Sequence, residues 1–76
     1  MKLDDIYSEK YELFLKRLRE ARLEAGLTQE EAAGLLGKSQ YFVSRSETGE
    51  RRVDVIELEA FATVYQKPIS YFLSLL

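Results

Sequence analysis

The chain has 76 residues, of which 46% are apolar, and this length suits one small domain whose core is drawn from nearly every element. It has no Cys and no His, which excludes disulfides, zinc fingers and catalysis by a thiolate or an imidazole. Acids near the amino terminus, and the lack of any apolar run approaching ~18 residues, argue against a signal peptide or a membrane span, so we expect a cytoplasmic protein.

The net charge is −2, but the charges are unevenly distributed along the chain. Residues 38–52 carry four basic and two acidic side chains, a local charge of +2. Residues 53–76 carry one basic and three acidic side chains, a local charge of −2. The middle of the chain is therefore suited to face DNA, although a solvated charged surface would give the same pattern.

The first predicted element is an amphipathic helix over residues 8–25, because apolar side chains recur there at steps of three and four. It follows a short extension of about residues 1–8, and Gly26 supplies the left-handed cap that commonly ends a helix. Thr28 and Glu31 have the spacing of a capping box, which predicts the start of a second helix.

The second predicted helix is short, because Gly37 ends it barely two turns after its start. Ser39 is the expected cap of a third helix, which runs from Gln40 to about Glu47 and is closed by Gly49 in the same way. This third helix has few strongly apolar residues, so we expect most of its surface to face a polar environment.

A second capping box, formed by Asp54 and Glu57, predicts a fourth helix over residues 55–65. Pro68 breaks that helix together with the preceding lysine, and it suits the start of a last helix over about residues 69–75. No period-two run supports a strand, so the sequence predicts an all-α fold of five helices.

Only three residues, Gly37-Lys38-Ser39, join the second and third helices, which is typical of a helix-turn-helix unit. Ala33 is small where the two helices cross, Gly37 takes a conformation that a Cβ penalises, and Val43 reaches the core. With the residue that starts the second helix, they fall at positions 1, 5, 9 and 15 of such a unit: Gln29, Ala33, Gly37 and Val43. The predicted fold is a single compact domain over residues 1–76 built around this unit.

The sequence resembles the Cro and phage-repressor-like helix-turn-helix proteins, the XRE family, over roughly residues 10–74. The stretches that carry the resemblance are Leu18-Arg19-Glu20-Ala21-Arg22, Ala25-Gly26-Leu27-Thr28-Gln29-Glu30-Glu31-Ala32-Ala33, Gly37-Lys38-Ser39-Gln40 and Glu47-Thr48-Gly49-Glu50-Arg51. The resemblance implies a lambda-repressor-like five-helix domain whose third helix enters the major groove of double-stranded DNA, as a homodimer on a palindromic operator.

Further expectations follow from the resemblance for single residues. Arg22 interrupts the apolar face of the first helix, where a bare charge is costly, and the resemblance gives it Glu47 as the partner in a structural ion pair. Lys38 and Ser46 stand where the family has a small or apolar and a bulky apolar residue, respectively, so each loses core packing. We expect Phe42 and neighbouring aromatic residues to compensate.

The first turn of the third helix carries the residues expected to reach base edges. Gln40 suits a bidentate contact to adenine, although it is also an ordinary helix-forming residue. Tyr41 either packs on a thymine methyl group or a sugar, or is half-buried against the second helix. Ser44 and Arg45 lie one turn further on the same side, where Arg45 takes either a guanine or a phosphate.

Other residues are expected to position the domain on phosphates. Gln29 begins the second helix and resembles the phosphate-contacting glutamine of the family, the alternative being an ordinary first-turn residue. Lys38, Ser39, Arg51 and Arg52 flank the third helix, and the three cations suit flexible phosphate contacts or a solvated loop.

The end of the chain is more apolar than burial alone requires, which predicts a homodimer contact through the fourth and fifth helices. The candidate residues are Tyr71, Phe72, Leu75 and Leu76.

The predicted function is a sequence-specific transcription regulator of the repressor type. We expect no enzymatic activity, cofactor, metal, small-molecule ligand or membrane contact. Two alternatives stay open: the DNA-binding antitoxin of a toxin–antitoxin pair, and a protein-interaction module, for which the acidic pI of about 5.1 argues.

Overall fold

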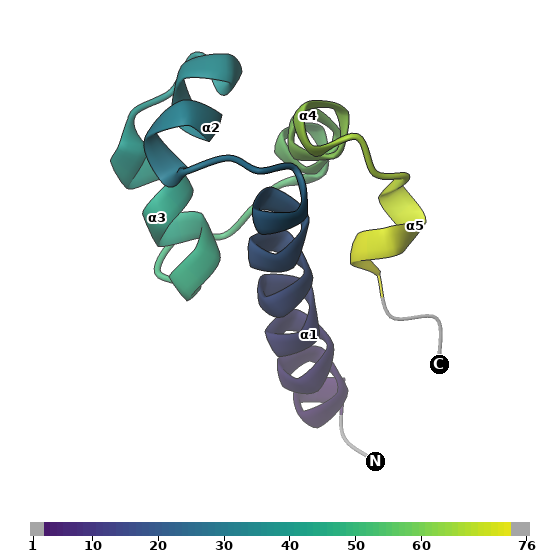
Figure 1. Ribbon diagram of the computed structural model, residues 1–76. Helices are drawn as coiled ribbons and strands as arrows, with labels where there is room; N and C mark the ends of the chain where they lie inside the picture. Colours follow the sequence, from purple (N-terminus) through teal and green to yellow (C-terminus); the bar gives the residue numbers. More distant parts are fainter. Residues whose placement is uncertain (1–2, 74–76) are drawn as a thin grey trace.

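The computed structural model describes residues 3–73, which form five helices around a common core. They are α1 (Leu3–Glu24), α2 (Gln29–Leu36), α3 (Gln40–Thr48), α4 (Val55–Tyr65) and α5 (Ile69–Phe72). The long α1 packs on α3, α4 and α5, with α2 and α3 on one side of it and α5 on the other (Figure 1). The prediction of an all-α, five-helix fold is confirmed, and no strand occurs in the described part of the chain.

The two outer helices differ in length from the prediction. α1 begins at Leu3 rather than near Ser8, and the intervening residues include no Gly or Pro that would end a helix. α5 ends at Phe72 rather than near residue 75, because Leu73 takes an extended backbone conformation.

The inner helix ends follow the capping signals. Thr28 and Glu31 make both hydrogen bonds of a capping box at the start of α2, and Asp54 and Glu57 do the same at α4. The end of α4 has a different cause from the predicted proline break. Gln66 adopts a left-handed conformation with φ of 57°, closing the helix before Pro68 is reached.

The core is assembled from all five helices. Its fully enclosed side chains include Leu18 of α1, Val43 of α3, Phe61 of α4 and Phe72 of α5. α2 contributes small residues, two buried alanines, which allow it to approach its neighbours closely.

Ser46 lies in this core with no exposed surface, although a hydroxyl replaces the expected bulk. Its hydroxyl donates to the carbonyl of Phe42 at 2.6 Å and accepts from Arg51 at 3.4 Å, so the buried oxygen is satisfied. The Phe42 ring stacks on Phe61 with centroids 5.8 Å apart. Aromatic packing thus lies close to Ser46 in the chain, and the expected compensation for the missing apolar side chain stays a prediction.

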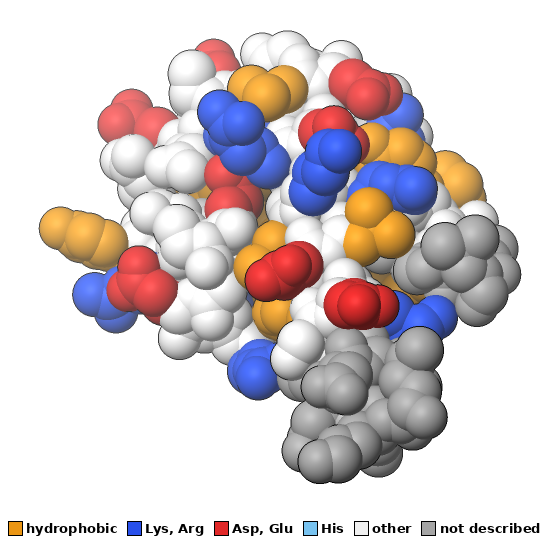
Figure 2. All heavy atoms as spheres, turned by 90° about the horizontal axis from the view of Figure 1, so that it is seen from below, with side chains coloured by type: hydrophobic (Ala, Val, Ile, Leu, Met, Phe, Trp, Pro, Cys, Tyr) orange, Lys and Arg blue, Asp and Glu red, His pale blue; other side chains and the backbone are white. Residues whose placement is uncertain are grey.

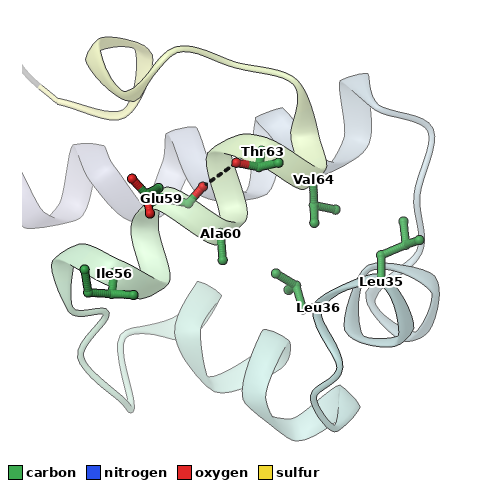
Figure 3. Close-up of a pocket in the computed structure, with 7 residues that line it drawn as sticks. All are labelled: Leu35, Leu36, Ile56, Glu59, Ala60, Thr63 and Val64. Atoms are coloured by element: carbon green, nitrogen blue, oxygen red, sulfur yellow. Dashed lines mark hydrogen bonds between the residues drawn. The ribbon is translucent and has the colours of Figure 1, made fainter.

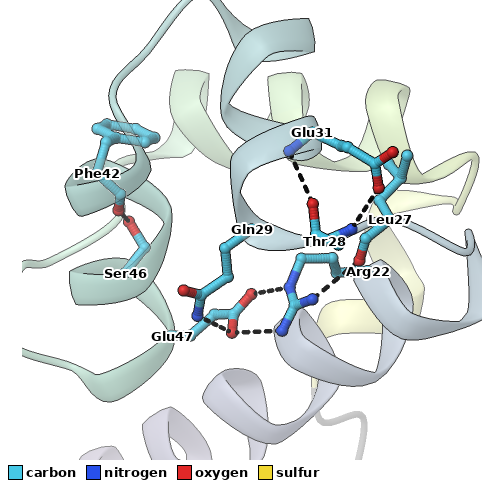
Figure 4. A network of polar contacts seen from close by, with 8 residues as sticks. All are labelled: Arg22, Leu27, Thr28, Gln29, Glu31, Phe42, Ser46 and Glu47. Carbon is cyan, nitrogen blue, oxygen red and sulfur yellow. Dashed lines mark hydrogen bonds and ion pairs between the residues drawn. The ribbon is translucent and has the colours of Figure 1, made fainter.

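One buried ion pair ties α1 to the end of α3. Arg22 Nε lies 2.6 Å from Glu47 Oε2, Arg22 Nη2 lies 3.1 Å from Glu47 Oε1, and the two side chains are only 8% and 4% exposed (Figure 4). A third bond runs from Arg22 Nη1 to the carbonyl of Leu27, 2.9 Å away. The hydrogen bond to Glu47 raises the pKa of Arg22. The guanidinium therefore holds the loop before α2 as well as α3.

Replacing Glu47 by glutamine should leave Arg22 buried without a counter-charge, which costs about 3–5 kcal/mol. The whole domain is expected to have only about 4–11 kcal/mol of stability. We expect thermal unfolding followed by circular dichroism to show a Tm lowered by more than about 10 °C.

The matched control is Glu24→Gln, which removes a carboxylate from an exposed pair with Lys67. That variant should melt close to the wild type. Equal melting temperatures for the two variants would show that the Arg22–Glu47 pair does not stabilise the fold.

Candidate nucleic-acid interface

α2 and α3 form a helix-turn-helix unit whose turn is closed by backbone geometry. Gly37 adopts a left-handed conformation with φ of 69°, and the next amide donates to the carbonyl of Ala33 at 2.9 Å. Ser39 then caps α3 by accepting the Phe42 amide at 3.2 Å. A glycine is favoured at this point because it adopts such a positive φ without the strain that a Cβ brings.

α3 has one buried face and one open face. Val43 and Ser46 anchor it in the core, whereas Gln40, Tyr41 and Arg45 are exposed. Tyr41 is 70% exposed, so the alternative that it is half-buried against α2 is wrong. The sequence-predicted base-reading residues therefore lie on the open face of α3.

The exposed residues of α3 are organised rather than scattered. Gln40, Tyr41 and Ser44 line a shallow hollow on the helix surface. The guanidinium of Arg45 lies 5.3 Å from the centre of the Tyr41 ring, one helical turn away, in cation–π geometry. A flat aromatic ring, an amide and a cation are thus presented together.

Gln29 begins α2 and is more than an ordinary first-turn residue. Its side-chain nitrogen donates to Glu47 Oε1 at 3.1 Å (Figure 4). Gln29 thus belongs to a polar cluster around Arg22 that also contains Glu47 and the carbonyl of Leu27. No sequence pattern predicts the bond between Gln29 and Glu47, because the two residues are 18 positions apart.

Two of the predicted phosphate-contacting cations are exposed and flank α3. Lys38 Nζ lies 5.4 Å from the centre of the Phe42 ring, and the Arg52 guanidinium lies 4.7 Å from the centre of the Tyr11 ring. Both cations rest on aromatic surface while remaining accessible to solvent.

Arg51 was predicted to be a flexible cation, and the structure corrects this. Its guanidinium makes two hydrogen bonds to the Glu57 carboxylate, at 2.8 and 3.0 Å, and lies 4.2 Å from the centre of the Phe42 ring. This hydrogen bonding raises the pKa of Arg51 and lowers that of Glu57. The capping box identified Glu57 as a cap, but its carboxylate also fixes Arg51 in the unbound chain.

Charges of both signs share the surface. Figure 2 views the molecule from below and shows Lys and Arg side chains interspersed with Asp and Glu. The surface seen in this view is therefore mixed in charge rather than uniformly basic.

The predicted dimer patch needs a correction. Phe72 has no exposed surface and belongs to the core, Tyr71 is half-buried, and Leu75 and Leu76 lie outside the described residues. Phe72 was misjudged because a short α5 folds back against α1, which uses its ring for core packing.

The structure instead leaves apolar side chains open on α2 and α4. Leu35, Val55 and Ile56 are 64–70% exposed. A groove between the two helices is lined by Leu35, Leu36, Ile56, Glu59, Ala60, Thr63 and Val64 (Figure 3). The sequence already indicates exposed apolar side chains on α4, because this helix has apolar residues on more sides than one buried face requires.

Two further features, a membrane span and a group of metal ligands, are not found in residues 3–73. None of the helices there is long and apolar enough to cross a membrane. The same residues contain no group of three or more acidic side chains arranged to hold a metal ion.

Comparisons with known proteins agree with this geometry. A family profile described as a helix-turn-helix domain matches residues 13–68. A solved structure of an XRE-family-like protein from Pseudomonas syringae pv. tomato is 40% identical, with a TM-score of 0.85, and the match covers 91% of this chain and 84% of that one. The restriction-modification controller protein C.AhdI from Aeromonas hydrophila is 32% identical, with a TM-score of 0.75, and the match covers 82% of this chain and 94% of that one. No curated protein sequence matches.

The family profile spans most of the chain, and both solved structures share its fold at more than 30% identity. The turn between α2 and α3 and the open face of α3 have the geometry that such a family requires. The chain therefore belongs to the XRE family of helix-turn-helix DNA-binding transcription regulators.

Proposed function

We propose that this chain is a sequence-specific repressor that binds a palindromic operator as a homodimer, with α3 in the major groove. The observation that carries the proposal is the open face of α3, where Gln40, Tyr41 and Arg45 are exposed while Val43 and Ser46 anchor the helix. A helix held from behind by the core can present side chains to base edges at fixed positions.

The exposed residues of α3 are those that recognise the bases. Gln40 donates and accepts in a bidentate contact with adenine, and Tyr41 packs on a thymine methyl group or a sugar. Arg45 contacts a guanine or a phosphate from one turn further along. Ser44 lines the same hollow as Gln40 and Tyr41, and its hydroxyl contacts a base or a phosphate.

Positioning is assigned to groups around the unit. The amides at the start of α2, with the side chain of Gln29, face one phosphate. Lys38 and Arg52 supply cations on either side of α3, and the Ser39 hydroxyl keeps its own proton to donate, because it caps α3 as an acceptor. Arg51 contributes charge from its fixed position beside Glu57.

A second candidate has a specific observation in its favour. This candidate is control of restriction-modification genes, and the similarity to a restriction-modification controller protein supports it. Genes for a methyltransferase and a nuclease beside its own would support this candidate, whereas a toxin gene there would favour the antitoxin alternative.

The proposed homodimer uses the outward face of α4 rather than the buried Phe72. Ile56, Ala60 and Val64 are spaced by four and line the groove in Figure 3. When a second copy lies antiparallel across a two-fold axis at Ala60, Ile56 of one copy faces Val64 of the other. The small Ala60 permits close approach at the axis, so this surface is complementary to itself.

Replacing Gln40 by alanine tests base readout. We expect affinity for the preferred site to fall by about 1–3 kcal/mol, with relaxed preference at one base pair per half-site and little change on nonspecific duplex. Fluorescence anisotropy with a set of single-base operator variants measures this. An unchanged preference at every base pair would remove Gln40 from the readout.

Replacing Arg52 by alanine tests phosphate positioning and should have the opposite signature. Binding should weaken on all duplexes alike, and the slope of log affinity against log salt should fall by about one. Arg52 is preferred to Arg51 for this test because Arg51 also makes a two-point contact with Glu57. A loss confined to one operator would contradict the positioning role.

Replacing Ile56 by glutamine tests the dimer without changing charge. Val55→Gln is the matched control, because Val55 is equally exposed, at 70% against 69%, but does not line the groove. Sedimentation equilibrium should show that Ile56→Gln weakens self-association, and operator titration should show that it weakens DNA binding. Val55→Gln should change neither. A wild-type protein that is monomeric at high concentration yet binds a palindrome tightly would contradict the dimer.

A further inference from the structure

The cluster around Arg22 has one member that reaches the proposed DNA-facing surface. Glu47 Oε2 accepts a hydrogen bond from Arg22 Nε. Glu47 Oε1 accepts two, from Arg22 Nη2 and from the side-chain nitrogen of Gln29, each at 3.1 Å. Arg22 and the Glu47 side chain are buried, but Gln29 at the start of α2 is partly exposed. Gln29 therefore links the interior of the protein to its surface.

The chemistry of a primary amide makes this link directional. A carboxylate only accepts hydrogen bonds, so the NH₂ end of Gln29 must face Glu47 and the amide oxygen must lie on the other side. The amide group is planar, so fixing one N–H fixes the direction of the second N–H as well. A free glutamine would instead have to give up its rotamer freedom when it binds a ligand.

The charges of the cluster permit this arrangement close to DNA. An unpaired carboxylate there would repel phosphates, but Arg22 contacts both oxygens of Glu47 and neutralises it. The chain thus presents a neutral N–H donor, oriented by a buried ion pair, beside the amino-terminal amides of α2.

We propose that Glu47 is a positioning residue for DNA binding, which presets the Gln29 amide so that its second N–H donates to a backbone phosphate. This role rests on the proposed function, because it assumes that the start of α2 meets duplex DNA. It adds to the stabilising role of the Arg22–Glu47 pair, and the two roles are separable by experiment.

A double-mutant cycle separates the positioning role of Glu47 from its stabilising role. It compares the affinities of the wild type, Glu47→Asp, Gln29→Ala and the double variant for a mixed-sequence duplex. Aspartate keeps the charge opposite Arg22 but is one methylene too short to hold Gln29 as well. We expect Glu47→Asp to weaken duplex binding about two- to tenfold in the presence of Gln29 and to have no effect in the Gln29→Ala background. All four proteins are measured at a temperature where circular dichroism shows them folded.

Gln40 supplies the matched control, because it is an exposed glutamine of the same unit and makes no bond to Glu47 among the described contacts. On the same mixed-sequence duplex Gln40→Ala should change affinity little, and Glu47→Asp should cost the same affinity with and without Gln40. If Glu47→Asp costs the same affinity with and without Gln29, Glu47 acts only through stability and the positioning role is wrong. If the wild type has no duplex affinity at low salt, the proposed function fails and this role with it.

A spectroscopic readout on the wild-type protein needs no variant to fold. In ¹⁵N-resolved NMR spectra, the side-chain NH₂ of Gln29 should exchange with solvent more slowly, and rotate less freely about its C–N bond, than that of Gln40. Equal exchange and rotation for the two glutamines would show that the bond to Glu47 does not hold Gln29 in solution, and would overturn the proposal.

Discussion

The buried contact between Arg22 and Glu47 is the interaction on which the arrangement of the other elements depends. Burial of two charges is unfavourable unless each finds close partners. Here each guanidinium nitrogen of Arg22 and each carboxylate oxygen of Glu47 makes a hydrogen bond. The partners come from α1, from the loop before α2, from α2 itself and from the end of α3. Satisfying the two charges therefore fixes how the helix-turn-helix unit sits on α1, and with it the direction in which the open face of α3 points.

α3 illustrates how the interior supports a polar functional surface. A helix of nine residues is marginal in water alone, so its order comes from caps and tertiary contacts. Val43 and Ser46 enter the core, Ser39 and Gly49 close the ends, and Phe42 stacks on Phe61. None of these contacts uses the exposed face, which remains available for DNA. Lys38 and Arg52 flank α3 in the sequence and rest on aromatic rings, and they add positive charge in this part of a chain whose net charge is −2.

Features set by neighbouring residues could be predicted from the sequence, and features set by distant ones could not. The capping boxes at Thr28 and Asp54 and the left-handed Gly37 involve residues a few positions apart, so their patterns are readable. The bond between Gln29 and Glu47, the burial of Phe72 and the docking of Arg51 on Phe42 depend on how helices pack, which periodicity does not encode. Gln66 ends α4 without the glycine that usually signals a left-handed cap. The Arg22–Glu47 partnership was anticipated from family resemblance rather than from spacing.

The central claim is that the open face of α3 reads a DNA sequence, and selection of bound duplexes from a random pool tests it most directly. A dimer with two recognition helices predicts enrichment of a palindrome whose half-sites are centred about 34–36 Å apart, one turn of duplex. The enriched half-site should contain an adenine at the position that Gln40 reaches. Retention of duplexes without enrichment of any sequence, or no retention at low salt, would contradict the account.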